Sequence, residues 1–455
     1  MRKNHPLVIG TFILTLTGLI SRVIGFFYRI FLSRLFGEEG MGIYQLISPI
    51  LALSFSVTVA GIQTAVSKYV AGETTTHDYK SSMRILLVAF GISMMLSFGC
   101  SYLVYQNADW LALHILLESR CAPLLRIIAL SIPFSSIHCI INGYFYGIKQ
   151  TKIPAVTQLA EQFIRVSSVY IITYMQMEKG GIPTISIAVI GLVLGEIASM
   201  LISLLAIYIR FHKVAQCHTS LSGCPTICAR YTTIAKGILT LAIPLSANRV
   251  VVNILQSIES IYIPNKLQAY GMTNAEALST YGVLTGMALP LILFPSTLTN
   301  SVSVLLLPIV SEADSNHNQA LIGKAVTKSI RYCLLLGFVC TTGFLLFGRL
   351  AGKLLFQSEL AGSFIITLSF ICPFLYISST LGSILHGLGK TGITFLFNVI
   401  GLGIRLLFVF WAIPLFGIKG YLWGLLCSQL TITCLLLLAL RKFIYYNDKR
   451  IFNHT

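Results

Sequence analysis

Apolar segments of similar length recur along the whole chain and are separated by short polar connections. An α-helix needs roughly 20 mainly apolar residues to cross the hydrocarbon core of a bilayer, and the segments have about that length. The pattern therefore predicts twelve membrane-spanning helices, at residues 7–32, 43–66, 84–105, 122–146, 153–176, 184–210, 236–263, 281–307, 330–347, 363–386, 393–414 and 419–440. The predicted fold is an all-α polytopic membrane protein.

Composition agrees with this fold and excludes the soluble classes. Hydrophobic residues make up 55% of the chain and charged residues 10%, and the mean hydropathy is +0.82. Such values are typical of polytopic membrane proteins. The first apolar run is too long and too charged for a cleaved signal peptide, so we expect it to stay in the mature protein.

The net charge of +17 indicates a membrane topology rather than a nucleic-acid partner. If the amino terminus and alternate loops are assigned to the cytoplasm, nineteen lysines and arginines fall on that side, seven on the other side and six inside spans. Basic residues concentrate in the cytoplasmic loops of membrane proteins. We therefore expect both termini in the cytoplasm and no nucleic acid bound.

Two stretches, 131–166 and 371–406, align without a gap at an offset of 240 residues. Proline-phenylalanine, glycine, threonine and arginine coincide at fixed places, for example Arg165 with Arg405. Apolar composition alone does not produce such matches. The sequence therefore predicts a duplicated unit of six helices.

The predicted repeat divides the chain into two lobes that run parallel in the membrane, because each half has an even number of spans. We expect an amino-terminal six-helix lobe at 1–212, a cytoplasmic linker at 213–235, a carboxy-terminal six-helix lobe at 236–441 and a cytoplasmic tail at 442–455. In transporters built from such repeats the substrate site lies near the membrane midplane at the repeat interface. The duplication therefore favours a transporter that works by alternating access.

The first predicted span carries Arg22 and Arg29, seven residues apart and therefore on one helix face. An arginine at the bilayer centre costs about 3 kcal/mol on insertion scales, so intramembrane arginines usually face a polar cavity. The alternative is that these side chains snorkel to the nearer headgroups, and Arg29 lies closer to the end of the segment. If they face a cavity, an anionic ligand is expected there.

The seventh span carries a polar stripe. Arg249 corresponds to Arg22 of the first half, at an offset slightly shorter than 240 residues. The same helical face continues through Asn253, Gln256 and Ser260. A polar stripe on an otherwise apolar span is expected to face a wet interior. We therefore predict that Arg22 and Arg249 face each other across a central cavity that binds substrate.

Three carboxylates inside the spans are candidates for ion coupling or for lining the cavity. Glu161 and Arg165 are four residues apart on one helix and can pair, and the alternative role of this pair is only to make both charges tolerable in the membrane. Glu259 borders the polar stripe, and Glu196 has no evident partner in the sequence. Arg165 and Arg405 are further candidates for the cavity.

Other polar side chains have simpler explanations. Gln63, near the end of the second span, is a cavity candidate, with hydrogen bonding between helices as the alternative. The cysteines lie mostly inside apolar spans, where they act as small hydrophobes. Cys217, His218, Cys224 and Cys228 lack the paired spacing of common zinc sites. We therefore predict no metal ion and no cofactor.

Several stretches resemble one known family: SRVIGFFYRIFLSRLFG from Ser21, GIYQLI from Gly42, AGIQTAVSKYVAGE from Ala60 and GYFYGIKQTKIPAVTQLAEQFIRV from Gly143. They resemble the stage V sporulation protein B-like polysaccharide flippases of the multidrug/oligosaccharidyl-lipid/polysaccharide exporter superfamily. With the duplicated halves, the likeness covers essentially the whole chain.

The resemblance implies a V-shaped bundle of two six-helix lobes in the bacterial cell membrane. Such a protein contacts membrane lipids and moves a polyprenyl-pyrophosphate-linked saccharide to the outer face, without acting as an enzyme. The saccharide would be a peptidoglycan precursor or another unit of a surface polysaccharide. A role in spore cortex or cell-wall synthesis, with glycan synthases as partners, follows from the same resemblance.

The chain departs from the lipid II flippases of the same superfamily. Their first arginine matches Arg22, but their second one falls on Tyr28, one place before Arg29. Their eighth helix has charged residues before Phe-Pro, whereas the uncharged GMALPLIL precedes Phe294-Pro295 here. This chain also has twelve predicted spans, whereas the lipid II flippases have fourteen. The resemblance therefore implies a lipid-linked saccharide without specifying lipid II.

Two other functions stay open from the sequence. A multidrug or cation exporter of the same fold would use Glu161, Glu196 and Glu259 for a cationic cargo, although arginines outnumber these glutamates in the spans. A membrane-embedded glycan-modifying enzyme would need an acid–base cluster, and the outward loops are short with few ionisable residues. A phosphate-binding loop for ATP is also missing from the sequence. Transport would then draw on ion or voltage gradients, or on consumption of the product outside.

Overall fold

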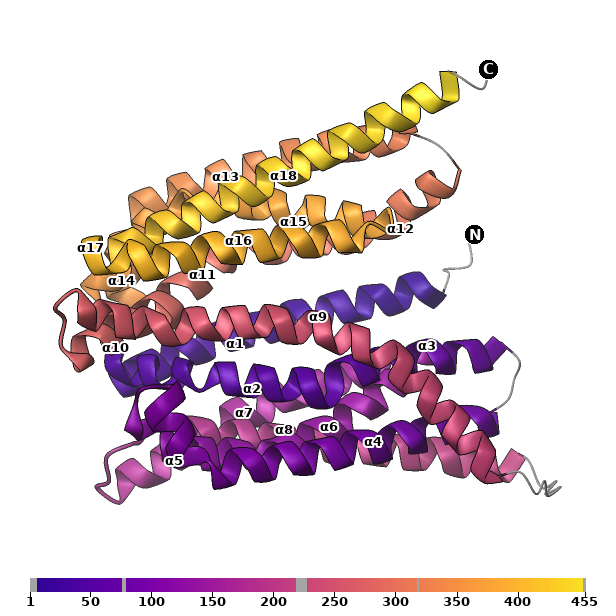
Figure 1. Cartoon of the computed structure of the whole chain (residues 1–455). Coiled ribbons are helices and arrows are strands. Elements are labelled where there is room, and N and C mark those ends of the chain that lie inside the picture. The colour runs from indigo at the N-terminus through magenta and orange to yellow at the C-terminus, as the bar shows by residue number, and fades with distance from the viewer. Residues whose placement is uncertain (1–5, 76–78, 218–226, 317–318, 453–455) are drawn as a thin grey trace. The chain divides into compact units, whose positions relative to one another are not determined.

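The computed structural model describes residues 6–75, 79–217, 227–316 and 319–452, and every regular element in these ranges is helical (Figure 1). The α-helices are α1 (Pro6–Leu46), α2 (Ser48–Phe55), α3 (Gly61–Thr75), α4 (Tyr79–Gln106), α5 (Ala108–Trp110), α6 (Ala122–Gly147), α7 (Lys152–Glu178), α8 (Ser186–Cys217), α9 (Ile227–Ala269), α10 (Asn274–Gly282), α11 (Leu289–Leu293), α12 (Ser296–Ser315), α13 (Gln319–Phe356), α14 (Glu359–Ser369), α15 (Cys372–Gly387), α16 (Thr391–Trp411), α17 (Ile413–Phe416) and α18 (Ile418–Phe452). Shorter turns are the π-helical η1 (Ser56–Ala60), η2 (Leu111–Ile115) and η4 (Val283–Ala288) and the 3₁₀ turn η3 (Ser119–Cys121). The all-α prediction is confirmed for this part of the chain.

Helices long and apolar enough to cross a membrane account for most of the predicted spans. Among the described residues nine helical runs meet that condition, and a tenth does if α14 and α15 count as one bent span. One run, Ile13–Glu73, is 61 residues long and covers most of the predicted span 7–32 and all of the span 43–66. The more polar α7 covers the predicted span 153–176. The expected count of twelve is consistent with these helices.

Prolines break two of the predicted spans. The span expected at 281–307 divides into α11 and α12 at Phe294-Pro295. The span expected at 363–386 divides into α14 and α15 just before Pro373, with a bend of 59°. Proline lacks a backbone N–H and disfavours helical geometry in the residue before it. Each proline therefore lies at or next to the first turn of a new helix.

The chain forms two compact units. Unit 1 contains Met1–Tyr28 and Leu46–Ser257, and unit 2 contains Arg29–Gln45 and Ile258–Thr455. The two long helices α1 and α9 each contribute one part to unit 1 and the other part to unit 2. The lobes expected from the repeat are a different division, drawn along the sequence, and their linker at 213–235 stays a prediction.

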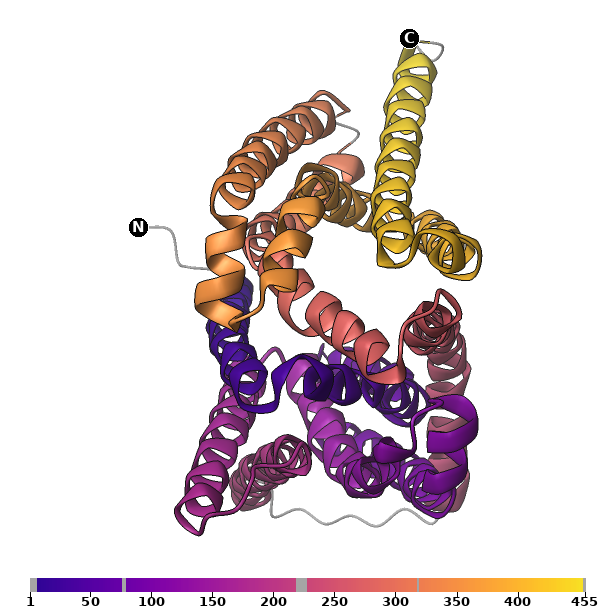
Figure 2. The same cartoon turned by 90° about the vertical axis from the view of Figure 1, so that its left-hand side faces the viewer.

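In unit 1, α6 packs against α3, α4 and α8, and α8 packs against α7 (Figures 1 and 2). The core includes Val59, Val66, Tyr144 and Phe145, each at most 1% exposed. Lipid tails are as apolar as these side chains, so transfer out of water does not hold the helices together. Close van der Waals packing supplies the attraction instead.

In unit 2, α13 packs against α14 and α15, α12 packs against α15, and α16 packs against α18. The tyrosines Tyr281, Tyr376 and Tyr421 are at most 2% exposed. The hydroxyl of Tyr376 donates to the backbone carbonyl of Ile292 at 3.2 Å. A buried hydroxyl needs such a partner, and the bond ties α15 to α11.

The α6–α7 and α15–α16 turns share one hydrogen-bonding pattern at an offset of 240 residues. The N–H of Gln150 donates to the carbonyl of Phe145 at 2.9 Å, and the N–H of Lys390 donates to the carbonyl of Leu385 at 2.9 Å. This 6→1 bond closes a helix in the Schellman motif. The repeat found in the sequence is therefore also present in the backbone.

The residue inside each of these turns has a left-handed backbone. The φ angle is 60° at Lys149 and 71° at Gly389. Glycine adopts this conformation freely, whereas a residue with a Cβ loses roughly 1–2 kcal/mol there. The first half has the same turn with a lysine at this position. The two halves therefore share the turn geometry although the residue type differs.

The carboxy-terminal part of α1 crosses α10 at two glycines in unit 2. A Cβ on Gly42 would lie 2.1 Å from the carbonyl oxygen of Leu278, and a Cβ on Gly282 would lie 2.2 Å from that of Glu38. The Glu38 carboxylate also accepts a hydrogen bond from Ser279 at 2.6 Å. Small residues are what allow membrane helices to approach this closely.

The Gly42→Leu variant tests this crossing. Over-packing costs about 1–3 kcal/mol, and the clash here involves the backbone, which yields less easily than a side chain. We expect the purified variant to unfold at a lower temperature than wild type, followed by circular dichroism in detergent. Gly99→Leu is the control, because a Cβ on Gly99 has no neighbour within 4 Å. Equal midpoints for the two variants would contradict a tight crossing.

Candidate functional site

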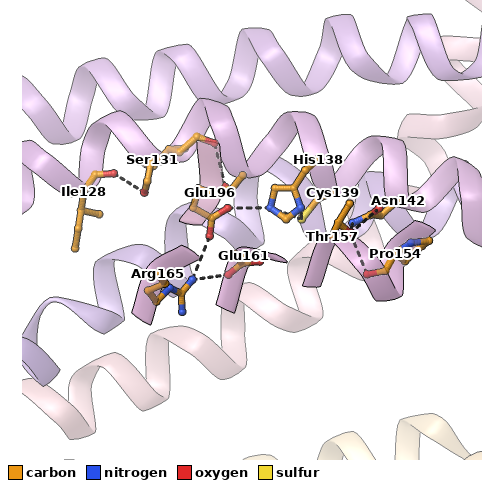
Figure 3. Close-up of polar contacts among 12 residues, drawn as sticks. Ile128, Ser131, His138, Cys139, Asn142, Pro154, Thr157, Glu161, Arg165 and Glu196 are labelled. Carbon is orange, nitrogen blue, oxygen red and sulfur yellow. Dashed lines mark hydrogen bonds and ion pairs between the residues drawn. The ribbon is translucent and has the colours of Figure 1, made fainter. Parts of the chain in front are cut away.

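Four ionisable side chains from α6, α7 and α8 meet inside unit 1 (Figure 3). The Nε2 atom of His138 lies 2.8 Å from Oε2 of Glu196, and Oε1 of Glu196 lies 3.9 Å from the guanidinium of Arg165. Arg165 also pairs with Glu161, one turn earlier on α7. None of the four side chains is more than 19% exposed. We call His138, Glu161, Arg165 and Glu196 the charged cluster.

Helix spacing and one small residue position the charged cluster. Glu161 and Arg165 are four residues apart on α7, so their side chains lie on the same face. A Cβ on Gly195 of α8 would lie 2.9 Å from the carbonyl oxygen of Glu161, so the two helices are close at this point. The contact brings the next residue, Glu196, within reach of Arg165.

The charges of the cluster balance only if it binds one more cation. With His138 neutral, two carboxylates face a single guanidinium, and an unbalanced charge is costly inside a membrane. The ligand atoms of His138, Glu161 and Glu196 lie within 4.8 Å of one another, which is a spacing that suits a metal ion. Arg165 already contacts both carboxylates and would repel a metal cation. The arrangement therefore favours a proton on His138 as the balancing charge.

A second buried ion pair lies in unit 2. The carboxylate of Glu259 on α9 accepts hydrogen bonds from Nε and Nη2 of Arg405 on α16, both at 2.6 Å. The hydroxyl of Tyr421 on α18 donates to the same carboxylate at 2.6 Å. Glu259 is 3% exposed and Tyr421 is 2% exposed. The charges of this pair are balanced, and its hydrogen bonds join three helices.

Arg165 and Arg405 occupy equivalent places in the repeat, and both engage carboxylates. Arg165 pairs with Glu161 of its own helix. Gly401 stands at the corresponding place in the second half, and Glu259 from α9 supplies the carboxylate instead. Each of these arginines is therefore neutralised within its own unit, and a contact of either with substrate stays a prediction.

The remaining arginines of the predicted site are exposed. Arg22 and Arg29 lie on α1 and Arg249 lies on α9, where Gln256 is exposed as well. Arg22 and Arg249 belong to unit 1, and Arg29 belongs to unit 2. The opposition of Arg22 and Arg249 across a cavity stays a prediction.

Two predicted cavity residues take part in helix packing within unit 1. The side-chain amide of Asn253 donates to the carbonyl of Ala52 at 3.2 Å and to the hydroxyl of Ser56 in η1. Gln63 is half-buried on α3, and its carbonyl oxygen lies 2.8 Å from the place of a Cβ on Gly143 of α6. At Asn253, therefore, the polar stripe of α9 holds this helix against the α2–η1 segment.

Sequence reasoning missed His138 and Tyr421. Their carboxylate partners are on other helices, 58 and 162 residues away in the chain. Helical periodicity relates residues of one helix only, so it cannot identify such contacts. The rarity of a histidine inside a membrane span was the one available signal.

The cysteine-containing loop after the sixth span lies largely outside the described residues, His218 and Cys224 included. No metal site can be assigned there from the part of the chain that the structure describes. The described cysteines with known surroundings, such as Cys139 and Cys333, are free thiols. Both are buried in helices, as expected for small apolar residues.

Comparison with known proteins gives the family. Residues 7–314 match the model of the family described as "Polysaccharide biosynthesis protein". Stage V sporulation protein B of Bacillus subtilis (strain 168) is 27% identical over 428 residues, which cover 94% of this chain and 82% of that protein.

Solved structures show the same fold. The lipid II flippase MurJ in an inward closed conformation superposes with a TM-score of 0.70 at 16% identity, over 94% of this chain and 87% of that one. An inward-facing multidrug resistance MATE family transporter of the MOP superfamily gives a TM-score of 0.68 at 15% identity, over 94% and 96% of the two chains. Because the family model matches more than half of its length, this multi-pass membrane protein belongs to the polysaccharide biosynthesis protein family.

Proposed function

We propose that this chain is a flippase that carries a polyprenyl-pyrophosphate-linked saccharide across the cell membrane by alternating access. The family match over residues 7–314 is the observation that carries the proposal. Its relatives of known structure are transporters and a flippase, not enzymes, which also argues against a glycan-modifying enzyme. Cell-wall or spore glycan synthases would consume the saccharide on the outer side.

The exposed arginines supply the chemistry that a pyrophosphate requires. Arg22 and Arg249 are exposed residues of unit 1. An exposed arginine in hydrocarbon is costly in free energy, and binding of an anionic cargo would offset that cost. A guanidinium binds two phosphate oxygens at once through its planar donors. We therefore assign the pyrophosphate to Arg22 and Arg249, with Gln256 as a further contact. The role of Arg29 stays a prediction.

The carboxylates give less support to a multidrug or cation exporter. Glu161 and Glu196 contact Arg165, and Glu259 is bound bidentately by Arg405. A cationic cargo would need a carboxylate whose charge is not already balanced by Arg165, by Arg405 or by a proton on His138. The acidic residues predicted for the cavity are thus used inside the protein, whereas Arg22, Arg29 and Arg249 are exposed.

We assign ion coupling to the charged cluster. The imidazole of His138 can bind a proton, and the carboxylates of Glu161 and Glu196 beside it favour the charged form. Glu161 and Arg165 face it from α7, Glu196 faces it from α8, and Cys139 is its neighbour on α6. Each proton changes the net charge of a buried group by one. Such a change can favour one of two transporter conformations, provided that they bind the proton unequally.

Arg22→Ala and Arg249→Ala test the assignment of the pyrophosphate. Loss of a hydrogen bond to a charged group costs about 1.5–3 kcal/mol, so transport should fall at least about tenfold in each variant. Arg22→Lys should restore little, because lysine is a point charge without the planar donor pair. The measurement is transport of a fluorescent polyprenyl-pyrophosphate disaccharide in proteoliposomes.

Arg126→Ala is the matched control for these arginine variants. Arg126 pairs with Asp109 at 2.6 Å, and the two side chains are 48% and 63% exposed. Such a surface pair contributes little to stability, so this variant should transport normally. Full transport by both Arg22→Ala and Arg249→Ala, at normal amounts in the membrane, would contradict a role in binding pyrophosphate.

Glu196→Gln tests the coupling. In this variant the Arg165–Glu161 pair is balanced while His138 is neutral, so the cluster no longer needs a proton. We expect the pH profile of transport in Glu196→Gln to lie at lower pH than in wild type, because the imidazole of His138 loses the carboxylate that favours its charged form. Glu178→Gln, at the exposed end of α7, should behave as wild type. An unaltered pH profile in Glu196→Gln would place the coupling elsewhere.

The orientation in the membrane is tested with reporter fusions. Basic residues favour the cytoplasmic side by nineteen to seven, so both termini and the 213–235 linker should be cytoplasmic. A green fluorescent protein at the carboxyl terminus should fluoresce, and alkaline phosphatase there should be inactive. Alkaline phosphatase fused after Gly180, in a predicted outward loop, should be active. The opposite pair of results would refute the orientation.

A further inference from the structure

Unit 2 contains a cavity of about 370 Å³ between α12, α15, α16 and α18. Its polar lining includes Ser378, Ser383, Asn398 and Gln429, and Phe397 is part of its apolar wall. The hydroxyl of Ser378 donates to Oε1 of Gln429 at 3.3 Å, which links α15 to α18 at the cavity. The volume falls in the range of small-molecule sites.

The lining of this cavity is polar but uncharged. Among the described residues that form it there is no aspartate, glutamate, lysine or arginine, and His386 is exposed. Hydroxyl and amide groups both donate and accept hydrogen bonds. A phosphate or a metal cation would lose its hydration here without meeting an opposite charge. An uncharged ligand with many hydroxyls and some apolar surface fits this lining better.

The two halves of the repeat differ at two positions that line the cavity in unit 2. At the 240-residue offset, Gly382 corresponds to Asn142 and Phe397 to Thr157. In unit 1 the amide of Asn142 donates to the hydroxyl of Thr157 at 3.2 Å and bridges α6 and α7 (Figure 3). In unit 2, Gly382 has no side chain, and a Cβ there would meet only Thr394, at 3.6 Å. Unit 2 therefore has open space at the place where unit 1 has the Asn142–Thr157 hydrogen bond.

The same comparison shows that the second half lacks two ionisable residues of the first half. Ser378 stands at the place of His138, and Gly401 stands at the place of Glu161, so the second half lacks two members of the charged cluster. Arg405 is bound by Glu259 and is not part of the cavity lining. At the place of His138, unit 2 therefore has the uncharged lining of the cavity, and the Arg405–Glu259 ion pair lies outside that lining.

We propose that this cavity binds an uncharged saccharide ring of the cargo, an assignment that rests on the proposed function. The amides of Asn398 and Gln429 and the hydroxyls of Ser378 and Ser383 hydrogen-bond the ring hydroxyls. Phe397 packs against the C–H face of the ring. The protein thus selects its cargo by a neutral sugar as well as by the pyrophosphate.

Gly382→Leu tests this assignment because its side chain extends into the cavity. The full-length protein in lipid nanodiscs is titrated with undecaprenyl pyrophosphate and with the same lipid carrying N-acetylglucosamine or galactose, and binding is measured by native mass spectrometry. We expect wild type to bind a sugar-bearing lipid about tenfold more tightly than the bare lipid. Gly382→Leu should bind the bare lipid as wild type does and lose this preference. Gly403→Leu is the control, because a Cβ on Gly403 has no neighbour within 4 Å.

A second pair of variants keeps the test decisive if Gly382→Leu misfolds. Asn398→Ala should weaken only the sugar-bearing lipids, whereas Gln158→Ala, at the matching position of α7, should not. A sugar preference that persists in Gly382→Leu and Asn398→Ala overturns the assignment, as does wild type binding all three lipids equally. Wild type that binds none of the polyprenyl pyrophosphates overturns the proposed function itself.

Discussion

Balancing charge away from water is the constraint on which this structure depends. Removing an ion from water costs several kcal/mol, and only close partners offset that cost. For Arg405 this cost is offset by the bidentate carboxylate of Glu259, which also accepts a hydrogen bond from the hydroxyl of Tyr421. For Arg165 the cost is offset by two glutamates, of which one also contacts a histidine. The helices that carry these residues must therefore stay in register where the ion pairs form.

Comparison of the two halves shows which features they share and where they differ. The turns after α6 and α15 have the same hydrogen bonds and the same left-handed residue position. The side chains around them have diverged, from Glu161 to Gly401 and from Asn142 to Gly382. Backbone geometry is needed by both halves to fold, whereas the charges are free to change if a new partner compensates. Glu259 is that partner for Arg405.

Features that are local along the chain could be predicted from the sequence, and contacts between helices could not. The spans follow from apolar length, the repeat from a fixed offset, and the Glu161–Arg165 pair from spacing on one helix. One continuous span was predicted at 363–386, and the bend of 59° before Pro373 was not predicted. The Glu259–Arg405 pair joins residues 146 positions apart, and no periodicity relates them. The cavity of unit 2 could not be predicted from the sequence either, because it results from the packing of four helices.

The unequal halves suit a cargo with unequal parts. A lipid-linked saccharide presents a doubly charged pyrophosphate and an uncharged sugar, and two identical lobes would offer the same chemistry to both. Gly401 and Gly382 stand where the first half has Glu161 and Asn142, and the first half has the cluster that we propose for ion coupling. Under the proposed function, the difference between the halves therefore separates the group assigned to energy coupling from the cavity assigned to the sugar.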